Sequence, residues 1–154
     1  MRRALVIAAV AIVAGACTGV NAKTSTYATL AEAQPAIDQG FMPAGLPSSS
    51  YEIRAAYVPD GWQRWGIINF PQAGTAELRS FLKPEEISLA GLRCDVPGRI
   101  EWWPVQLRNQ LDAERIAATG AKAYRSRAGN LVVVVNWTQG RAYYWTRPER
   151  SESE

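Results

Sequence analysis

The most constraining stretch of the sequence is the continuous apolar run LVVVV at residues 131–135. Turn-forming pairs flank this run, Gly-Asn at 129–130 and Gln-Gly at 139–140. Beyond each turn lies another strand-like run, at residues 122–127 and 142–146. Short apolar runs separated by such turns predict an antiparallel three-stranded meander. Because the middle run has no polar face, we expect it to be buried on both sides of a sheet.

A second strand signal lies at residues 51–57, where apolar and polar side chains alternate. A turn at 59–61 connects it to the run 62–70, and the two runs together predict a hairpin. Neither face of the run 62–70 is cleanly polar, which indicates that both faces are at least partly covered. The remaining apolar spacings and caps predict three short helices, at residues 75–82, 84–92 and 112–120, the last with Asp112 as its N-cap.

These elements predict an α+β fold in which one antiparallel sheet combines the N-terminal hairpin with the C-terminal three-stranded meander. The short helices are expected to pack on one face of that sheet. The domain itself is expected to span residues 51–148, with a disordered acidic tail at 149–154. Residues 17–50 are rich in Gly, Ser, Thr, Ala and Pro without a sustained period, so they are predicted to be a flexible tether. Residues 1–16 are assigned to a signal peptide.

The signal-peptide assignment depends on the order of charge and hydrophobicity at the start of the chain. Arg2 and Arg3 precede an unbroken apolar run at residues 4–16, and Cys17 follows. That order of segments is typical of an export signal. A membrane-spanning helix needs roughly 20 apolar residues, so the run is too short for a comfortable permanent anchor.

The small residues Ala14, Gly15 and Ala16 directly before Cys17 resemble the lipobox of bacterial lipoproteins. The resemblance implies that Cys17 is acylated and becomes the mature N-terminus, with more than one chain to hold the protein on a membrane. Thr18, where a retention signal would have Asp, implies an outer-membrane lipoprotein that faces the periplasm. Two alternatives remain open, an ordinary secretory signal cleaved before a chance cysteine and an uncleaved anchor.

The body of the chain carries a looser resemblance. Its residues LPSSSYEI at 46–53, WWP at 102–104 and YYWT at 143–146 resemble small uncharacterised lipoprotein domains of Gram-negative bacteria. This resemblance implies a class of protein and supplies no active residues that could be transferred to the chain.

Charge and composition exclude several kinds of function. The sequence has 17 basic and 14 acidic residues, and removal of Arg2 and Arg3 with the signal leaves it almost neutral. Basic residues are interspersed with acidic ones, so no nucleic-acid partner is expected. The chain has no histidine, the commonest general base and metal ligand, and we expect neither a metal nor a cofactor. If Cys17 is acylated, Cys94 has no partner in the chain and is expected to be a buried thiol.

Six tryptophans are the most informative residues for binding. Aromatic rings with a polar tip are favoured at binding surfaces, and the candidate surface comprises Trp102, Trp103 and Trp65. Successive side chains alternate on an extended backbone, so we expect one ring of the Trp102–Trp103 pair to be exposed. The alternative is that these rings fill the core between the sheet and its helices.

The sequence therefore predicts a non-catalytic cell-envelope lipoprotein that is tethered to the membrane and binds a protein partner or peptidoglycan. No catalytic residues are assigned. Two alternatives belong to other classes. One is a periplasmic inhibitor or immunity-type lipoprotein that blocks a lytic enzyme, and the other is a glycan-binding or glycan-modifying module that uses exposed tryptophan.

Overall fold

The structure, a computed structural model, describes residues 21–148. The predicted signal peptide, Cys17 and the predicted disordered tail lie outside the described residues. The larger elements are β1 (Lys23–Thr29), α1 (Gln34–Asp38), β2 (Tyr51–Tyr57), β3 (Arg64–Asn69), α2 (Thr75–Phe81), β4 (Leu82–Ile87), α3 (Ala113–Ala118), β7 (Lys122–Ser126), β8 (Leu131–Asn136) and β9 (Arg141–Thr146). Short elements are η1 (Gln72–Gly74), β5 (Arg93–Cys94), η2 (Val105–Leu107) and β6 (Asn109–Gln110). Among these residues, no helix is long and apolar enough to cross a membrane.

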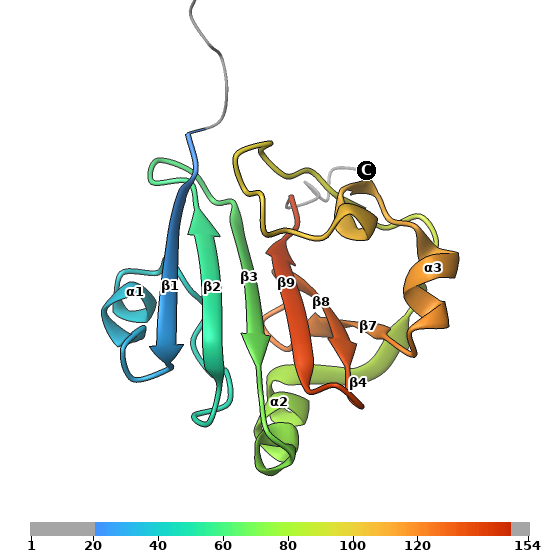
Figure 1. The fold of residues 1–154 in the computed structure, drawn as a ribbon, viewed down its shortest axis with the longest axis horizontal. Helices are drawn as coiled ribbons and strands as arrows, with labels where there is room; N and C mark the ends of the chain where they lie inside the picture. Colours follow the sequence, from blue (N-terminus) through green and yellow to red (C-terminus); the bar gives the residue numbers. More distant parts are fainter. Residues whose placement is uncertain (1–20, 149–154) are drawn as a thin grey trace, which may run out of the picture.

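One antiparallel sheet with the strand order β1-β2-β3-β9-β8-β7-β4 organises the domain (Figure 1). The predicted meander is confirmed as β7, β8 and β9, and every residue of β8 is buried. The predicted hairpin is confirmed as β2 and β3, and β3 pairs with β9 to join the two parts. The α+β class is therefore confirmed.

The predicted tether is wrong within the described residues. Residues 23–29 form the edge strand β1, which pairs with β2 along its whole length. The following segment is anchored in the core by Ala33, Met42 and Leu46, each at most 5% exposed. Arg64 Nε also donates a 2.9 Å hydrogen bond to the carbonyl oxygen of Gly40. The domain therefore begins near Lys23, well before the predicted boundary at Tyr51.

The segment 84–92 was predicted to be helical because Pro84, Glu85 and Glu86 resemble a first helical turn, and this prediction is wrong. The segment begins inside β4, which pairs with β7 at the other edge of the sheet. Pro84 is tolerated there because an edge strand needs ladder hydrogen bonds on one side only. The register shifts between Leu82 and Glu86, around the proline.

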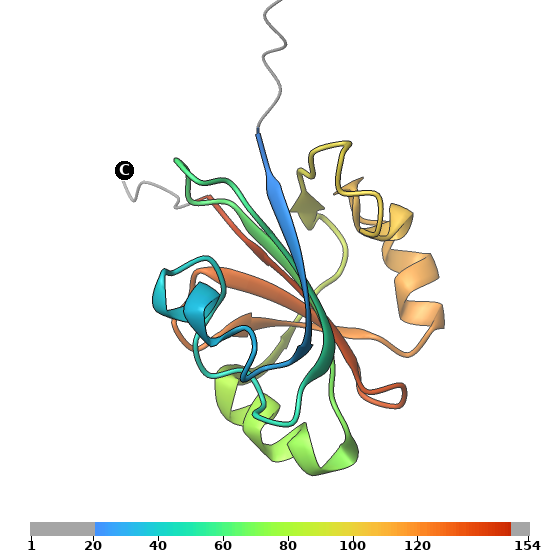
Figure 2. The same ribbon diagram turned by 60° about the vertical axis from the view of Figure 1, so that its left-hand side comes forward.

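Helices cover both faces of the sheet, which corrects the prediction of one covered face (Figure 2). On the first face, called the α2 face, α1 and α2 pack through Ala36 and Leu78 against the strands. On the second, called the α3 face, Ile116 of α3 and the irregular segment 93–112 cover the strands. As predicted, Asp112 caps α3 by accepting a hydrogen bond from the backbone N–H of Arg115 at 3.1 Å. The sheet therefore separates two hydrophobic cores.

Candidate binding groove

Strands β1 and β3 begin, and β9 ends, at the same end of the sheet (Figure 1). A wide groove at this end has a volume of about 1040 Å³. We call it the terminal groove, because the first and last described residues, Asn21 and Pro148, both line it. Its other lining residues come from the β2–β3 loop, from β3 and β9, and from the segment 93–109: Trp62, Gln63, Trp65, Arg93, Asp95, Val96, Pro97, Gly98, Arg99, Asn109, Trp145 and Thr146. The volume suits a small ligand or a few side chains of a partner.

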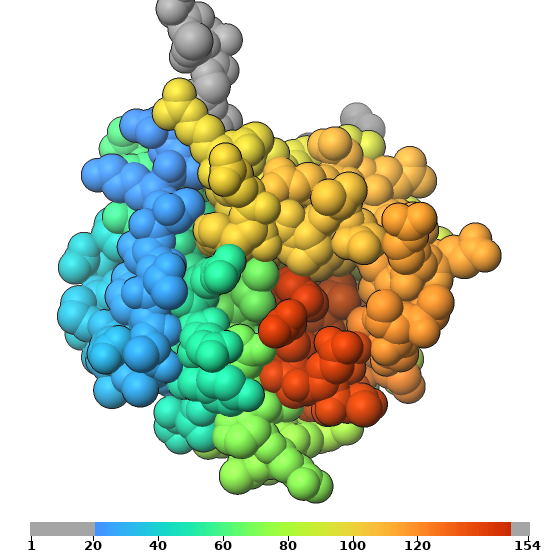
Figure 3. Space-filling model, in the orientation of Figure 1, coloured from blue at the N-terminus to red at the C-terminus, as the bar shows by residue number. Residues whose placement is uncertain are grey.

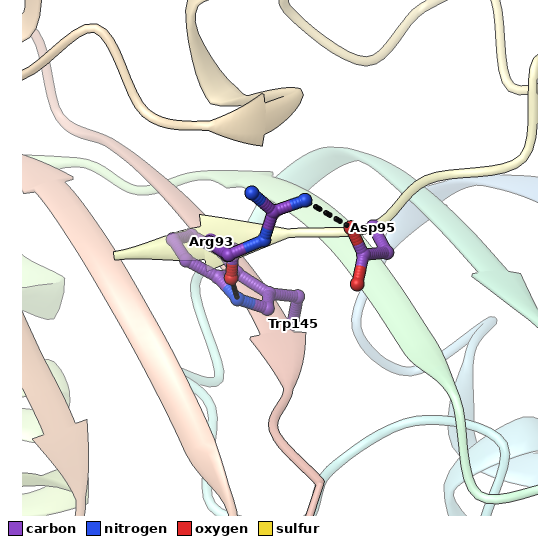
Figure 4. Close-up of polar contacts among 3 residues, drawn as sticks. All are labelled: Arg93, Asp95 and Trp145. Carbon is purple, nitrogen blue, oxygen red and sulfur yellow. Dashed lines mark hydrogen bonds and ion pairs between the residues drawn. The ribbon is translucent and has the colours of Figure 1, made fainter. Parts of the chain in front are cut away.

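Two tryptophans of neighbouring strands form the floor of the terminal groove. Trp65 of β3 and Trp145 of β9 are register partners on the α3 face, and they are 3% and 2% exposed. The indole Nε1 of Trp145 donates a 3.1 Å hydrogen bond to the carbonyl oxygen of Arg93 (Figure 4). Trp103 supports the same ring from below in an edge-on contact with centroids 6.1 Å apart. The floor is therefore fixed by hydrogen bonding and packing.

The walls of the terminal groove are charged on one side and aromatic on the other. Arg93 and Asp95 form a 3.3 Å ion pair whose side chains are 60% and 81% exposed (Figure 4). A pair this exposed contributes little to stability, so a partner can compete for either member. Arg99 is exposed on the same wall, and the facing loop carries Trp62, which is 52% exposed. An exposed tryptophan beside arginine has the composition of an interface hot spot.

The structure separates the three predicted tryptophans instead of placing them on one surface. Trp103 is 1% exposed and donates a 2.9 Å hydrogen bond from Nε1 to the carbonyl oxygen of Leu107. Trp65 is buried as the floor of the terminal groove, so neither ring is a free stacking platform. Trp102 is half-buried and lines a different groove, over the strands. Residues 101–103 lie in turns, so the expected alternation along an extended backbone does not apply there.

Trp62 was not among the predicted site residues, although a sequence signal for it exists. It directly follows the turn at residues 59–61, and the structure leaves it outside β2 and β3. A large apolar side chain at the tip of a hairpin has no sheet face to pack against. That position marks Trp62, more than the tandem pair, as an exposed aromatic.

Cys94 lies beneath the terminal groove and is a buried free thiol, as predicted. Burial raises its pKa well above the ordinary value of 9.0, and hydrogen bonding to the Trp65 side chain offsets only part of the rise. The thiol therefore stays protonated at neutral pH, where a cysteine nucleophile would need to be a thiolate.

We expect this thiol to make the protein less stable in alkali. In the unfolded chain Cys94 ionises near pH 9.0 while the folded chain keeps the proton, so the free energy of unfolding falls as pH rises above that value. Between pH 8 and pH 10.5, ionisation of Cys94 in the unfolded chain lowers the free energy of unfolding by about 2 kcal/mol. Urea unfolding of the parent and of Cys94→Ala at both pH values measures this loss. The two proteins share every other titrating group, so only the parent should show the additional fall. Parallel losses in the two proteins would contradict the assignment.

Comparison of the chain with protein-family models, with curated proteins and with solved structures finds no match in any of the three. Within residues 21–148, no group of three or more His, Cys, Asp and Glu side chains is arranged to hold a metal ion. Function is therefore inferred from the grooves and the side chains that line them.

Proposed function

We propose that the chain is a non-catalytic lipoprotein of the cell envelope, tethered through acylated Cys17 to the outer membrane, that binds a protein partner in the terminal groove. The observation that supports this proposal is the position of the groove. Asn21 lines it, and Asn21 is only four positions after Cys17 in the chain.

The length of that connection sets where the groove opens. An extended chain spans at most about 3.5 Å per residue, so Asn21 lies within about 14 Å of an acylated Cys17. The terminal groove then faces the membrane surface, and its partner is a protein that reaches or occupies that surface. The exposed Trp62 supplies an aromatic anchor that the partner would bury, while the exposed Arg93, Asp95 and Arg99 supply charge complementarity of both signs.

The tether is tested by the intact mass of the protein extracted from the membranes of its host. We expect a mass that lacks residues 1–16 and gains a triacylated glycerol on Cys17. A Cys17→Ala chain is the control, and it should carry no lipid because it lacks the thiol that would be acylated. An unmodified mature chain in the soluble fraction would contradict the proposal and favour a freely diffusing periplasmic protein.

The groove is tested by site-specific photo-crosslinking in intact membranes. A photoreactive residue at Arg99, on the groove wall, should give one discrete protein adduct, whereas the same residue at Lys83, exposed on the far edge strand, should give none. Adding Trp62→Ala should reduce the adduct about ten-fold or more, because hot-spot residues dominate interface energy. Val105→Ala, which removes a side chain that is 78% exposed elsewhere, should leave the yield unchanged. Equal adducts from both positions would contradict a partner in the terminal groove.

A further inference from the structure

A second groove of about 510 Å³ lies on the α3 face, over β1, β2, β3 and β9, where the segment 93–112 leaves the strands uncovered. We call it the sheet-face groove. Figure 3 looks onto this face, with the groove over β3, between β2 and β9 and below the segment that follows residue 100. Its chemistry is carried by Glu52, Arg54, Asn69, Trp102, Arg141 and Tyr143.

The floor of the sheet-face groove contains a strained bulge in β2. Glu52 has a φ of 46°, which is uncommon outside glycine and asparagine, and the β2–β3 register shifts between Tyr51 and Arg54. The bulge leaves the carbonyl of Glu52 outside the ladder, and the side-chain amide of Asn69 donates to it at 3.3 Å. Bulges and strained residues of this kind cluster at binding sites, where they redirect side chains.

Asn69 connects the bulge to an arginine on the next strand. Its side chain is buried, with 8% of the residue exposed, and its Oδ1 accepts a 3.0 Å hydrogen bond from Arg141 Nε. That bond fixes one edge of the guanidinium and leaves the N–H groups of the two terminal nitrogens for a ligand. Within residues 21–148, neither Arg141 nor Arg54 forms an ion pair. Two arginine forks therefore line one groove, and neither is paired with a carboxylate of the described residues, that of Glu52 in the same groove included.

Two half-buried aromatic rings complete the sheet-face groove. Trp102 and Tyr143 both make edge-on contacts with the buried Trp103, with centroids 6.2 Å and 6.1 Å apart. Trp103 thus holds both rings in place while they line the groove. An immobilised ring lowers the entropy lost when a ligand binds.

We infer that the sheet-face groove binds a saccharide that carries a carboxylate. The arginine forks match the planar geometry of a carboxylate, and the rings offer an apolar surface for a sugar ring. Asn69 and Glu52 supply a donor and an acceptor for hydroxyl groups. The volume lies in the range of small-molecule sites.

An acidic peptide fits this groove less well. The strands beneath its centre, β2, β3 and β9, are interior strands, and each has a neighbouring strand on both sides. A peptide lying across them could not add to the ladder, so its own backbone N–H and C=O groups would be desolvated without partners. A saccharide has no such backbone and satisfies its hydroxyl groups through side chains.

The inference is tested by calorimetric titration of the intact protein, purified in detergent, with two soluble probes. The first is a tetrasaccharide of alternating N-acetylglucosamine and N-acetylmuramic acid, which carries lactyl carboxylates. The second is chitotetraose, which lacks them. The choice of the first probe rests on the proposed envelope location, whereas the binding assay does not depend on acylation. We expect the carboxylated probe to bind at least ten-fold more tightly than chitotetraose.

Variants assign this selectivity to residues. Arg54 is exposed, so Arg54→Ala should fold normally and should abolish the ten-fold preference, and Arg54→Lys should restore little of it because lysine lacks the fork. Trp102→Leu should weaken the binding of both probes by the same factor. Arg99→Ala, in the terminal groove, is the matched control and should leave the affinity for each probe unchanged. Absence of binding by either probe, or an Arg54→Ala protein that keeps its preference, would overturn the inference. If tetraglutamate bound more tightly than the carboxylated saccharide, and its binding depended on Arg54, the ligand would be an acidic peptide and the saccharide inference would be overturned.

Failure of this inference and failure of the proposed function can be told apart. Crosslinking at the terminal groove responds to Trp62→Ala, and saccharide binding responds to Arg54→Ala. The Trp62 side chain lines only the first groove and Arg54 only the second. If the protein bound the saccharide but formed no crosslinked adduct in membranes, the proposed partner in the terminal groove would be contradicted and the saccharide site would stand.

Discussion

Trp103→Ala is expected to lower the free energy of unfolding by about 3–5 kcal/mol, the loss typical of truncating a large aromatic side chain in a core. The indole is 1% exposed, and its removal leaves a large cavity on the α3 face. Its edge-on contacts with Trp102, Tyr143 and Trp145 disappear together with the hydrogen bond to the carbonyl oxygen of Leu107. Both grooves lose the ring that supports their aromatic residues.

Urea unfolding followed by far-UV circular dichroism measures this loss. Trp103→Phe should be intermediate, because it keeps most of the apolar volume and loses the indole hydrogen bond. Trp62→Ala is the matched control and should cost less than about 1 kcal/mol, because its side chain is 52% exposed. If Trp103→Ala unfolded like the parent while ligand binding was lost, Trp103 would be a surface residue and its position in the core would be wrong.

The sequence predicted the meander and α3 well because local signals there agree with the tertiary structure. Turn residues with positive φ, Gly129 and Gly140, flank a strand that is buried on both faces. Asp112 caps the helix through its own side chain. When the turn residues, the hydrophobic period and the helix cap favour the conformation that the tertiary contacts also require, the local sequence is enough to predict it.

The two edge strands were missed for different physical reasons. β1 has small polar residues and Tyr27 without an apolar period, since most of its side chains are exposed and its stability comes from the backbone ladder with β2. β4 carries the composition of a helix start at Pro84, Glu85 and Glu86. Its extended conformation is imposed by pairing with β7, which local propensity does not report.

The candidate sites were predictable only in part. The burial of Trp103 and the partial exposure of Trp102 depend on the turn before Pro104, in which the N–H of Trp103 donates to the carbonyl oxygen of Ile100 at 3.2 Å. Ile100 and Trp103 both pack in the core of the α3 face, a long-range contact that the local sequence does not show. The cluster of Arg54, Asn69 and Arg141 joins three strands that become neighbours only through the order β2-β3-β9. Strand order is set by long-range pairing, so no local pattern in the sequence brings these three residues together.

The second large effect is expected on the opposite, α2 face, where Gly66→Ala should cost about 3 kcal/mol or prevent folding. A Cβ atom at Gly66 would lie 2.2 Å from two ring carbons of Tyr144, its register partner on β9. Tyr144 is 1% exposed and is surrounded by core residues, so its ring has no free space into which to move. The glycine is therefore required by the ring above it, since its own φ is not in the left-handed region.

A double-mutant cycle with Tyr144 separates this collision from a general weakness of β3. In a Tyr144→Val background the space above residue 66 is vacated, so adding Gly66→Ala should cost less than about 1 kcal/mol, which gives a coupling energy of about 2 kcal/mol or more. Tyr144→Phe is the matched control: the ring stays, and the lost hydroxyl is buried without a hydrogen-bond partner among the described residues, so that change alone should be neutral or stabilising. In the Phe background Gly66→Ala should therefore remain as damaging as in the parent. Equal costs in the Val and Phe backgrounds would show that the ring does not set the requirement for glycine.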